Sequence, residues 1–210
     1  MYRMHHNDEN IPNFPSYMNK FINIEHKFQT VDSLSNYEKS IVHDVKEGPF
    51  IHGSLHPEYF YNDYILNLLQ EIYFSSSNPN LLYNKNTNNI AVHIRRGDVN
   101  PQKYPSRFIS NQTYIDLIKK LDLNNSTIHI FSEGKDSDFG DIVKSFPKTS
   151  FVMHLNENIQ LTFHYLVMAD VLILSKSSFS YCAALINNNV IVANLITRWW
   201  HKPLRSWQIV

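Results

Sequence analysis

Between residues 90 and 193, hydrophobic residues follow two patterns that alternate along the chain. Short runs such as IAVHIR, in which apolar residues occupy every second position, have the period of a β-strand. The segments between these runs have apolar residues at the three- and four-residue spacing of an amphipathic helix. Such an alternation is typical of βαβ units and a parallel sheet. It predicts strands at Ile90–Arg95, Thr127–Phe131, Ser150–Leu155, Val171–Leu174 and Val190–Ala193, and helices at Gln112–Leu121, Asp138–Phe146, Ile159–Met168 and Ser178–Ile186, the first of them capped by Asn111.

The chain before residue 90 is less regular. Residues 1–47 are polar and early prolines interrupt them, so they predict a poorly defined N-terminal extension. Residues 48–89 predict a connecting segment, with an amphipathic helix at Glu58–Phe74 and a polar loop after it. Residues 90–210 form the main predicted domain, a Rossmann-like α/β fold with a parallel sheet and helices on both faces.

The amino-acid composition limits which kinds of partner the protein is expected to bind. The chain has 210 residues, 43% of them hydrophobic, which is enough for one core of ordinary size. Lys and Arg total 19, as do Asp and Glu, so no overall basic field exists to collect nucleic acid. The single cysteine fits a reducing compartment, and no apolar run has the length of a signal peptide or a membrane span. We therefore expect a soluble, cytoplasmic protein with no membrane span and no nucleic-acid partner.

Two arginines follow the first predicted strand directly. In an open α/β sheet, ligands bind outside the carboxyl ends of the strands, and Arg95 and Arg96 would be delivered there. A planar guanidinium with five donors suits a phosphate or pyrophosphate. The alternative is that both arginines are solvated charges at the end of an edge strand.

The second candidate stretch is Asp170–Tyr181, DVLILSKSSFSY. An apolar strand runs into four polar residues, and the helix that follows presents free backbone N–H groups and its positive dipole end at Ser177 and Ser178. Such a helix start binds phosphate readily, although one of these serines is equally suited to be a simple N-cap. Because both candidate stretches end at the same sheet edge, together they favour a nucleoside diphosphate.

Two sequence blocks carry a resemblance to a known family. HIRRGD at His93–Asp98 is similar to the H-x-R-R-x-D signature of the α1,2-, α1,6- and protein O-fucosyltransferase superfamily. The downstream block ADVLILSKSSFS resembles the apolar strand of that superfamily that runs into S-S-F-S. The resemblance covers about residues 48–207. It implies the donor domain of the two-domain GT-B fold, GDP-fucose as the donor, inversion at the anomeric carbon, and no metal or other cofactor.

The resemblance also implies roles for individual residues. It makes Arg95 the catalytic residue and principal pyrophosphate ligand, and Arg96 a second basic contact. It puts His93 near the guanine or ribose, and Asp98 in a bond that orients the arginine loop. The residues that it implies for binding the nucleotide sugar are His93, Arg95, Arg96, Asp98, Ser177, Ser178 and Phe179, of which the last three would lie against the β-phosphate.

The chain departs from the family pattern at the nucleobase. Related sequences place a guanine-binding carboxylate one to three residues before the position of His164. This chain has Gln160, Leu161 and Thr162 there, and Glu157 is the alternative carboxylate.

A second departure concerns the front of the chain, where the first 45 to 85 residues are too few for the acceptor domain of a GT-B enzyme. We therefore expect the helix within residues 50–74 to pack on the donor domain, and activity to need a homo-oligomer or a partner subunit. The expected acceptor is a glycan or glycoconjugate. The alternative function is a catalytically silent domain that binds a nucleotide sugar, or that partners a complete glycosyltransferase.

Other patterns have competing explanations. Arg96–Asp98 spells the adhesion tripeptide RGD, but a match this short at the end of a buried strand arises by chance. Asp136–Asp138 fits the D-x-D pattern that holds Mn²⁺, or else caps the helix that begins there. The histidines show no zinc-ligand spacing with cysteine. The aromatic tail Thr197–Trp207 either closes the core over the last strand or stacks on a base or sugar.

Overall fold

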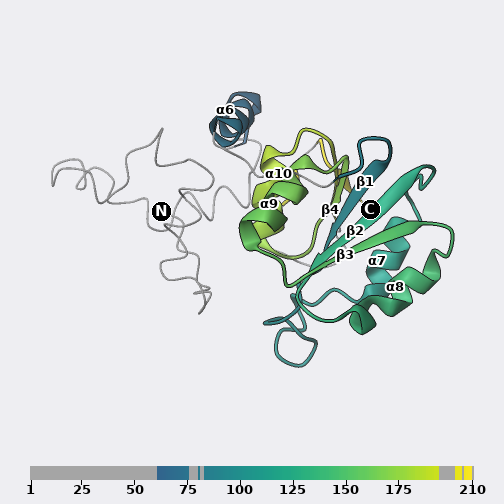
Figure 1. Cartoon of the computed structure of the whole chain (residues 1–210). Coiled ribbons are helices and arrows are strands. Elements are labelled where there is room, and N and C mark those ends of the chain that lie inside the picture. Colours follow the sequence, from purple (N-terminus) through teal and green to yellow (C-terminus); the bar gives the residue numbers. More distant parts are fainter. Residues whose placement is uncertain (1–60, 76–79, 81–82, 194–201, 205, 210) are drawn as a thin grey trace. The chain divides into compact units, whose positions relative to one another are not determined.

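A computed structural model describes residues 61–75, 80, 83–193, 202–204 and 206–209 (Figure 1). The chain divides into two compact units, residues 1–78 and 79–210. The predicted extension at residues 1–47 lies outside the described residues, and so do Trp199 and Trp200. The domain boundaries expected from the sequence stay a prediction.

In the first unit the described element is α6, Asp63–Phe74. Its N-cap is Asn62, whose Oδ1 accepts a hydrogen bond from the backbone N–H of Ile65 at 3.1 Å. The sequence predicted a start at Glu58. The helix begins later because Asn62, in an extended conformation, supplies the acceptor that an exposed first-turn N–H group needs.

The second unit is built on one six-stranded sheet in the order β3-β2-β1-β4-β5-β6, and every neighbouring pair is parallel. The first five strands were predicted from the alternating pattern, so the Rossmann-like α/β fold is confirmed. A sixth strand, two residues long, had no signal in the sequence. The strands are β1 Asn88–His93, β2 Ser126–Ser132, β3 Ser150–Leu155, β4 Val171–Ile173, β5 Val190–Ala193 and β6 Gln208–Ile209.

Helices cover both faces of this sheet, as predicted. Figure 1 shows α7 and α8 on one side, and α9 and α10 on the other. A short 3-10 helix, η3, precedes α8. The bounds are α7 Asn111–Ile118, η3 Asp136–Phe139, α8 Gly140–Ser145, α9 Ile159–Met168 and α10 Ser178–Ile186.

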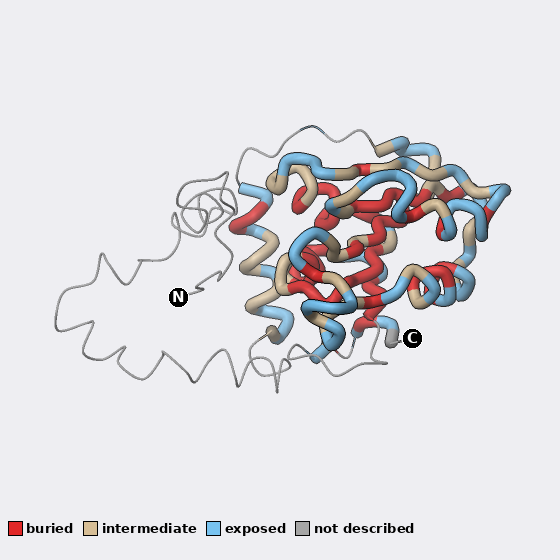
Figure 2. Tube along the Cα trace, turned by 90° about the horizontal axis from the view of Figure 1, so that it is seen from below, coloured by how far each residue is buried: buried red, intermediate tan, exposed pale blue. Residues whose placement is uncertain are grey.

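The alternation in β1 explains how the layers are held together. Ile90, Val92 and Ile94 are fully buried in a cluster with side chains of α7 and α8. Ala91, between them, is also fully buried, because β1 has a neighbouring strand on each side and helices on both faces. Figure 2 shows buried residues gathered in the interior, with exposed residues around them. A strand buried on both faces is typical of a parallel sheet.

The second core lies where β2 and β3 meet α9. The ring of Phe131 stacks on His154 with centroids 4.3 Å apart, and His154 lies 5.0 Å from Tyr165 of α9. His129 Nδ1 is 3.0 Å from His154 Nε2, and His154 Nδ1 is 2.9 Å from a carboxylate oxygen of Glu157. This core therefore buries a pair of imidazoles that its hydrogen bonds join to a half-exposed carboxylate.

Two more predicted helix starts need correction. The cap of α7 is Ser110, whose Oγ accepts from the N–H of Thr113 at 3.2 Å, and Asn111 is the first helical residue. The predicted start at Asp138 lies inside η3, and α8 begins at Gly140. Asp138 Oδ2 accepts from the N–H of Lys135 at 2.8 Å, so its carboxylate caps the 3-10 turn in place of the α-helix.

The described part of the tail packs on α10. The ring of Trp207, which is buried, makes an edge contact with Tyr181 at 5.1 Å. The hydroxyl of Tyr181 donates to the carbonyl oxygen of Lys202 at 2.9 Å. These contacts bring β6 beside β5, which agrees with a tail that closes the core over the last predicted strand.

Candidate functional site

The order of the strands reverses between β1 and β4. After β1 the chain builds outwards through β2 to β3, and after β4 it builds outwards in the other direction through β5. Because β1 and β4 are parallel neighbours, their carboxyl ends lie side by side. In open α/β sheets this switch point leaves a crevice where ligands bind. The two stretches that the sequence singled out follow these two strands.

A hydrogen bond joins the two strand ends. His93, the last residue of β1, places its Nδ1 3.0 Å from the hydroxyl of Ser175, which follows β4. Burial and then the charge of Arg95 lower the pKa of His93 to about 3, so its imidazole is neutral near pH 7. The ring of Phe179, in the first turn of α10, lies 5.6 Å away. A neutral imidazole at this place offers a ligand a hydrogen-bonding edge without charge.

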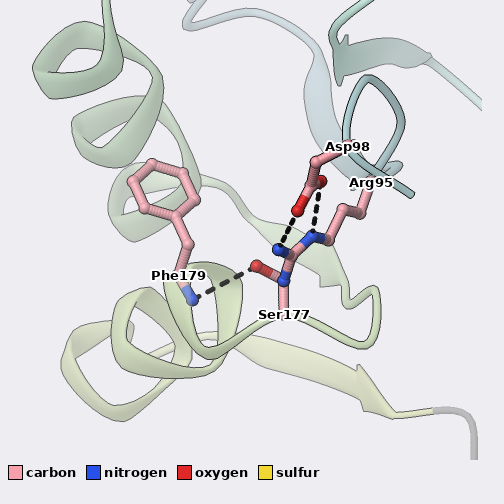
Figure 3. A network of polar contacts seen from close by, with 4 residues as sticks. All are labelled: Arg95, Asp98, Ser177 and Phe179. Atoms are coloured by element: carbon pink, nitrogen blue, oxygen red, sulfur yellow. Dashed lines mark hydrogen bonds and ion pairs between the residues drawn. The ribbon is translucent and has the colours of Figure 1, made fainter. Parts of the chain in front are cut away.

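Arg95 lies in the loop after β1 and is held by a bidentate ion pair with Asp98 (Figure 3). Its Nε is 3.2 Å from Oδ1, and its Nη2 is 2.6 Å from Oδ2. The side chain of Arg95 is 16% exposed and that of Asp98 is 38% exposed, so the pair sits at the rim of the sheet edge. Because the Asp98 carboxylate binds one side of the guanidinium, the plane of this group is fixed. A fixed plane suits the binding of a phosphate at a defined position.

Gly97 allows the arginine loop to turn. Its φ of +70° lies in the left-handed region, which residues with a side chain rarely adopt. The carboxylate of Glu133, just after β2, occupies the place where a Cβ on Gly97 would go. The backbone conformation therefore favours glycine, and a Cβ at this position would in addition displace the flexible end of the Glu133 side chain.

Arg96 contacts residues at the start of α7 and in the loop before it. Its Nη2 donates to Asn111 Oδ1 at 2.7 Å, and its guanidinium lies over the ring of Phe108, 4.4 Å from the centroid. The side-chain amide of Asn111 in turn donates to the carbonyl oxygen of Asp138 at 2.7 Å. These contacts tie the loop to the start of α7 and to η3. A phosphate contact by Arg96 stays a prediction, and its observed contacts are those of a residue that holds the loop.

The start of α10 lies at the end of β4, separated from it by one short turn. Ser177 is the N-cap, in an extended conformation, and its Oγ accepts from the backbone N–H of Phe179 at 3.3 Å (Figure 3). Ser178 is the first helical residue, so the cap role that the sequence left open between the two serines belongs to Ser177. The first N–H groups of the helix and its positive dipole end therefore lie at the same sheet edge as the Arg95 loop.

Lys176 is a feature of this edge to which the sequence analysis gave no role. Its side chain is only 3% exposed, and its Nζ donates to the carbonyl oxygen of Ser106 in the loop between β1 and α7. Burial lowers the pKa of Lys176. The signal in the sequence that could have singled out this residue was a lysine between two serines at the end of an apolar strand. Lysine is seldom buried at such a place.

The residues that were considered for binding the nucleobase or a metal ion make hydrogen bonds within the protein. Glu157, considered for the nucleobase, is bonded to His154. The first amides of α9, at Gln160 and Leu161, donate to the Asn158 side chain that caps it. Asp138 caps η3, and among the described residues no three His, Cys, Asp or Glu side chains are grouped so that they could hold a metal ion.

Comparisons with known proteins place the chain in no family. No family model matches it, and no curated protein matches it. Among solved structures it is similar to a trehalose-6-phosphate synthase, OtsA, at 14% identity and a TM-score of 0.34. That match covers 54% of this chain and 30% of the synthase, and similarity at this level supports no conclusion about activity. None of the helices in the described ranges has the length and apolar character that a membrane crossing requires.

Proposed function

We propose that this chain is a glycosyltransferase that binds the diphosphate of a nucleotide sugar between the ends of β1 and β4. The observation that carries the proposal is the meeting of the Arg95 loop and the α10 N-terminus at the switch point, joined by the bond between His93 and Ser175. A fixed guanidinium and the positive end of a helix dipole are both suited to phosphate oxygens. The resemblance of HIRRGD and SKSSFS to fucosyltransferase motifs supports the same ligand class.

In the proposed reaction, a hydroxyl of the acceptor attacks the anomeric carbon of the sugar from the side opposite the diphosphate. The new C–O bond forms as the bond from the anomeric carbon to the phosphate oxygen breaks, and the hydroxyl proton passes to a general base. The leaving diphosphate gains negative charge while the sugar becomes oxocarbenium-like. Arg95 and the first N–H groups of α10 stabilise that charge, a role that needs no metal ion.

The proposed donor is GDP-fucose, and the acceptor is a glycan or glycoconjugate. In this proposal the neutral edge of His93 contacts the guanine or ribose, and Ser177, Ser178 and Phe179 lie against the β-phosphate. Asp98 orients Arg95 through the bidentate pair. Arg96 supports the loop through Asn111.

The test combines binding and turnover on the purified full chain. Calorimetry with GDP, UDP, ADP and their sugars identifies the base and the sugar, and we expect GDP and GDP-fucose to bind most tightly. Release of GDP from GDP-fucose is then measured with a panel of glycan acceptors, in Mn²⁺ and in EDTA, with equal rates expected in both. Binding without turnover would favour a silent nucleotide-sugar-binding domain, and no binding of any member would refute the proposal.

A further inference from the structure

The strongest unassigned feature of the switch point is the buried charge of Lys176. The residue lies between Ser175, which bonds to His93, and Ser177, which caps α10. Lys176 is buried, with 3% of its surface exposed to solvent. The acceptor on its ammonium group is the neutral carbonyl oxygen of Ser106.

Within the part of the chain that the structure describes, no carboxylate forms an ion pair with this charge. The ion pairs among the described residues are Arg95 with Asp98 and His154 with Glu157, and neither includes Lys176. Lysine is almost never fully buried unless it is paired, because desolvating an ammonium group is strongly unfavourable. One neutral oxygen uses a single donor of the three on Nζ. A buried ammonium group with one neutral acceptor is therefore well suited to binding an anion.

Other positive groups lie near Lys176, and Asp98 pairs with one of them, Arg95. The N-terminus of α10 begins at the next residue but one, and the positive end of its dipole adds to the ammonium charge. The loop that holds Arg95 also contains Ser106, the hydrogen-bond partner of Lys176. A local excess of positive charge, in a chain whose Lys and Arg equal its Asp and Glu, matches a ligand that carries several negative charges.

We propose that Lys176 is a ligand of the diphosphate, and that its ammonium group moves from the Ser106 carbonyl to a phosphate oxygen when the nucleotide binds. Lys176 directly precedes Ser177, the residue that caps α10, so its side chain starts at the edge where the diphosphate is proposed to bind. A flexible stem with three rotatable donors can exchange one oxygen for another. The interaction selects diphosphates over nucleosides.

This inference rests on the proposed function of the same site, so its experiment separates the two. The full chain is titrated with GDP, GMP, guanosine and inorganic pyrophosphate as wild type, Lys176→Met and Lys176→Arg. Lys148→Met is the matched control, because it removes the same charge from an exposed residue ahead of β3, at the opposite edge of the sheet. Thermal unfolding of each variant is recorded alongside.

We expect Lys176→Met to weaken GDP and pyrophosphate about 10- to 100-fold, the range for a hydrogen bond to a charged group. Guanosine affinity should be unchanged, Lys176→Arg should recover most of the loss, and Lys148→Met should bind as wild type does. Equal GDP affinity in wild type and Lys176→Met would overturn the role of Lys176 and leave the proposed function standing. Failure of wild type to bind every phosphate ligand would instead refute the proposed function.

If Lys176→Met does not fold, a pH series tests whether the ammonium group of Lys176 binds the diphosphate. As pH rises towards the pKa of Lys176, which burial lowers, wild type should lose pyrophosphate affinity relative to Lys176→Arg. Arginine stays charged throughout, and taking the ratio cancels the ionisation of the ligand. A ratio that stays constant from pH 7 to about pH 10, near the ordinary lysine pKa, would contradict the inference.

Discussion

The guanidinium of Arg96 lies 2.7 Å from the side-chain oxygen of Asn111, whereas that of its neighbour Arg95 is paired with Asp98. Two consecutive arginines thus serve different parts of the molecule. Arg96 fastens the loop to the start of α7, and Arg95 stays at the rim of the sheet edge. Substituting each in turn should therefore separate loss of binding from loss of stability.

The first prediction concerns Arg95→Lys, which keeps the charge and removes the bidentate fork. If Arg95 grips the diphosphate, the variant should lose about 2 to 4 kcal/mol of transition-state stabilisation, on the scale of removing an oxyanion donor. The free energy of unfolding should barely change, since lysine keeps the charge opposite the partly exposed Asp98. Turnover of GDP-fucose and urea unfolding are the measurements. A folded variant with normal GDP binding and activity would remove Arg95 from the site.

Arg96→Lys should show the opposite pattern. It loses the bond to Asn111 and the stack on Phe108, so we expect the free energy of unfolding to fall by about 1 to 3 kcal/mol. Affinity for GDP should change by less than about threefold, which is under 1 kcal/mol. Urea unfolding and calorimetry on the same preparation test this. A large loss of GDP affinity at unchanged stability would restore Arg96 as a phosphate ligand.

Ser177→Ala and Ser178→Ala form a matched pair at the start of α10. Ser177 caps the helix, so its removal should lower the free energy of unfolding by about 1 kcal/mol, and removal of Ser178 leaves this cap in place. If the helix end binds phosphate, Ser177→Ala should also weaken GDP more than guanosine, because only GDP reaches the first N–H groups. Equal losses for both ligands would leave Ser177 with a capping role alone.

Gly97→Ala should disturb the arginine loop. A φ of +70° costs a residue with a side chain about 1 to 2 kcal/mol, and the new Cβ must also displace the carboxylate of Glu133. We expect the free energy of unfolding to fall by about 2 kcal/mol or more, with weaker GDP binding as the loop shifts. Gly140→Ala is the control, because a Cβ there meets no atom within 4 Å and should leave stability equal or higher. Equal effects of the two substitutions would show that the loop does not depend on Gly97.

Two histidines with lowered pKa values predict sensitivity to acid. Burial lowers the pKa of His93 to about 3, and burial together with the charge of His154 lowers that of His129 to about 4. Since an unfolded histidine has a pKa of about 6.5, the unfolded chain takes up protons first as pH falls. The stability that these groups contribute is therefore complete above about pH 6.5 and is lost towards pH 4, by at most about 1.4 kcal/mol per pH unit for each histidine.

Urea unfolding at several values between pH 7 and pH 5 measures this slope. His129→Asn should flatten it, because the variant lacks the imidazole that the core keeps neutral. The same slope in wild type and His129→Asn would show that this histidine does not couple folding to pH.

The sequence by itself determined the layers of the main domain. The bounds of β3, α9, α10 and β5 match the hydrophobic pattern residue for residue, because a period of two or of three to four residues is a local property of the chain. The same pattern, with the preference for parallel strands joined by helices, predicted that the HIRRGD and SKSSFS stretches end at one edge of the sheet.

Only the tertiary structure decided which neighbours these residues have. The order β3-β2-β1-β4-β5 depends on how whole strands pair, and it alone puts His93 beside Ser175, 82 residues later. Arg95 and Arg96 are equivalent by sequence, and they differ because α7 presents Asn111 to one of them. The short strand β6 and the burial of Lys176 likewise depend on partners far along the chain, at β5 and Ser106. A hydrogen bond between distant residues leaves no periodic signal in the sequence, so the chemistry of this edge became visible only when the strands were brought together.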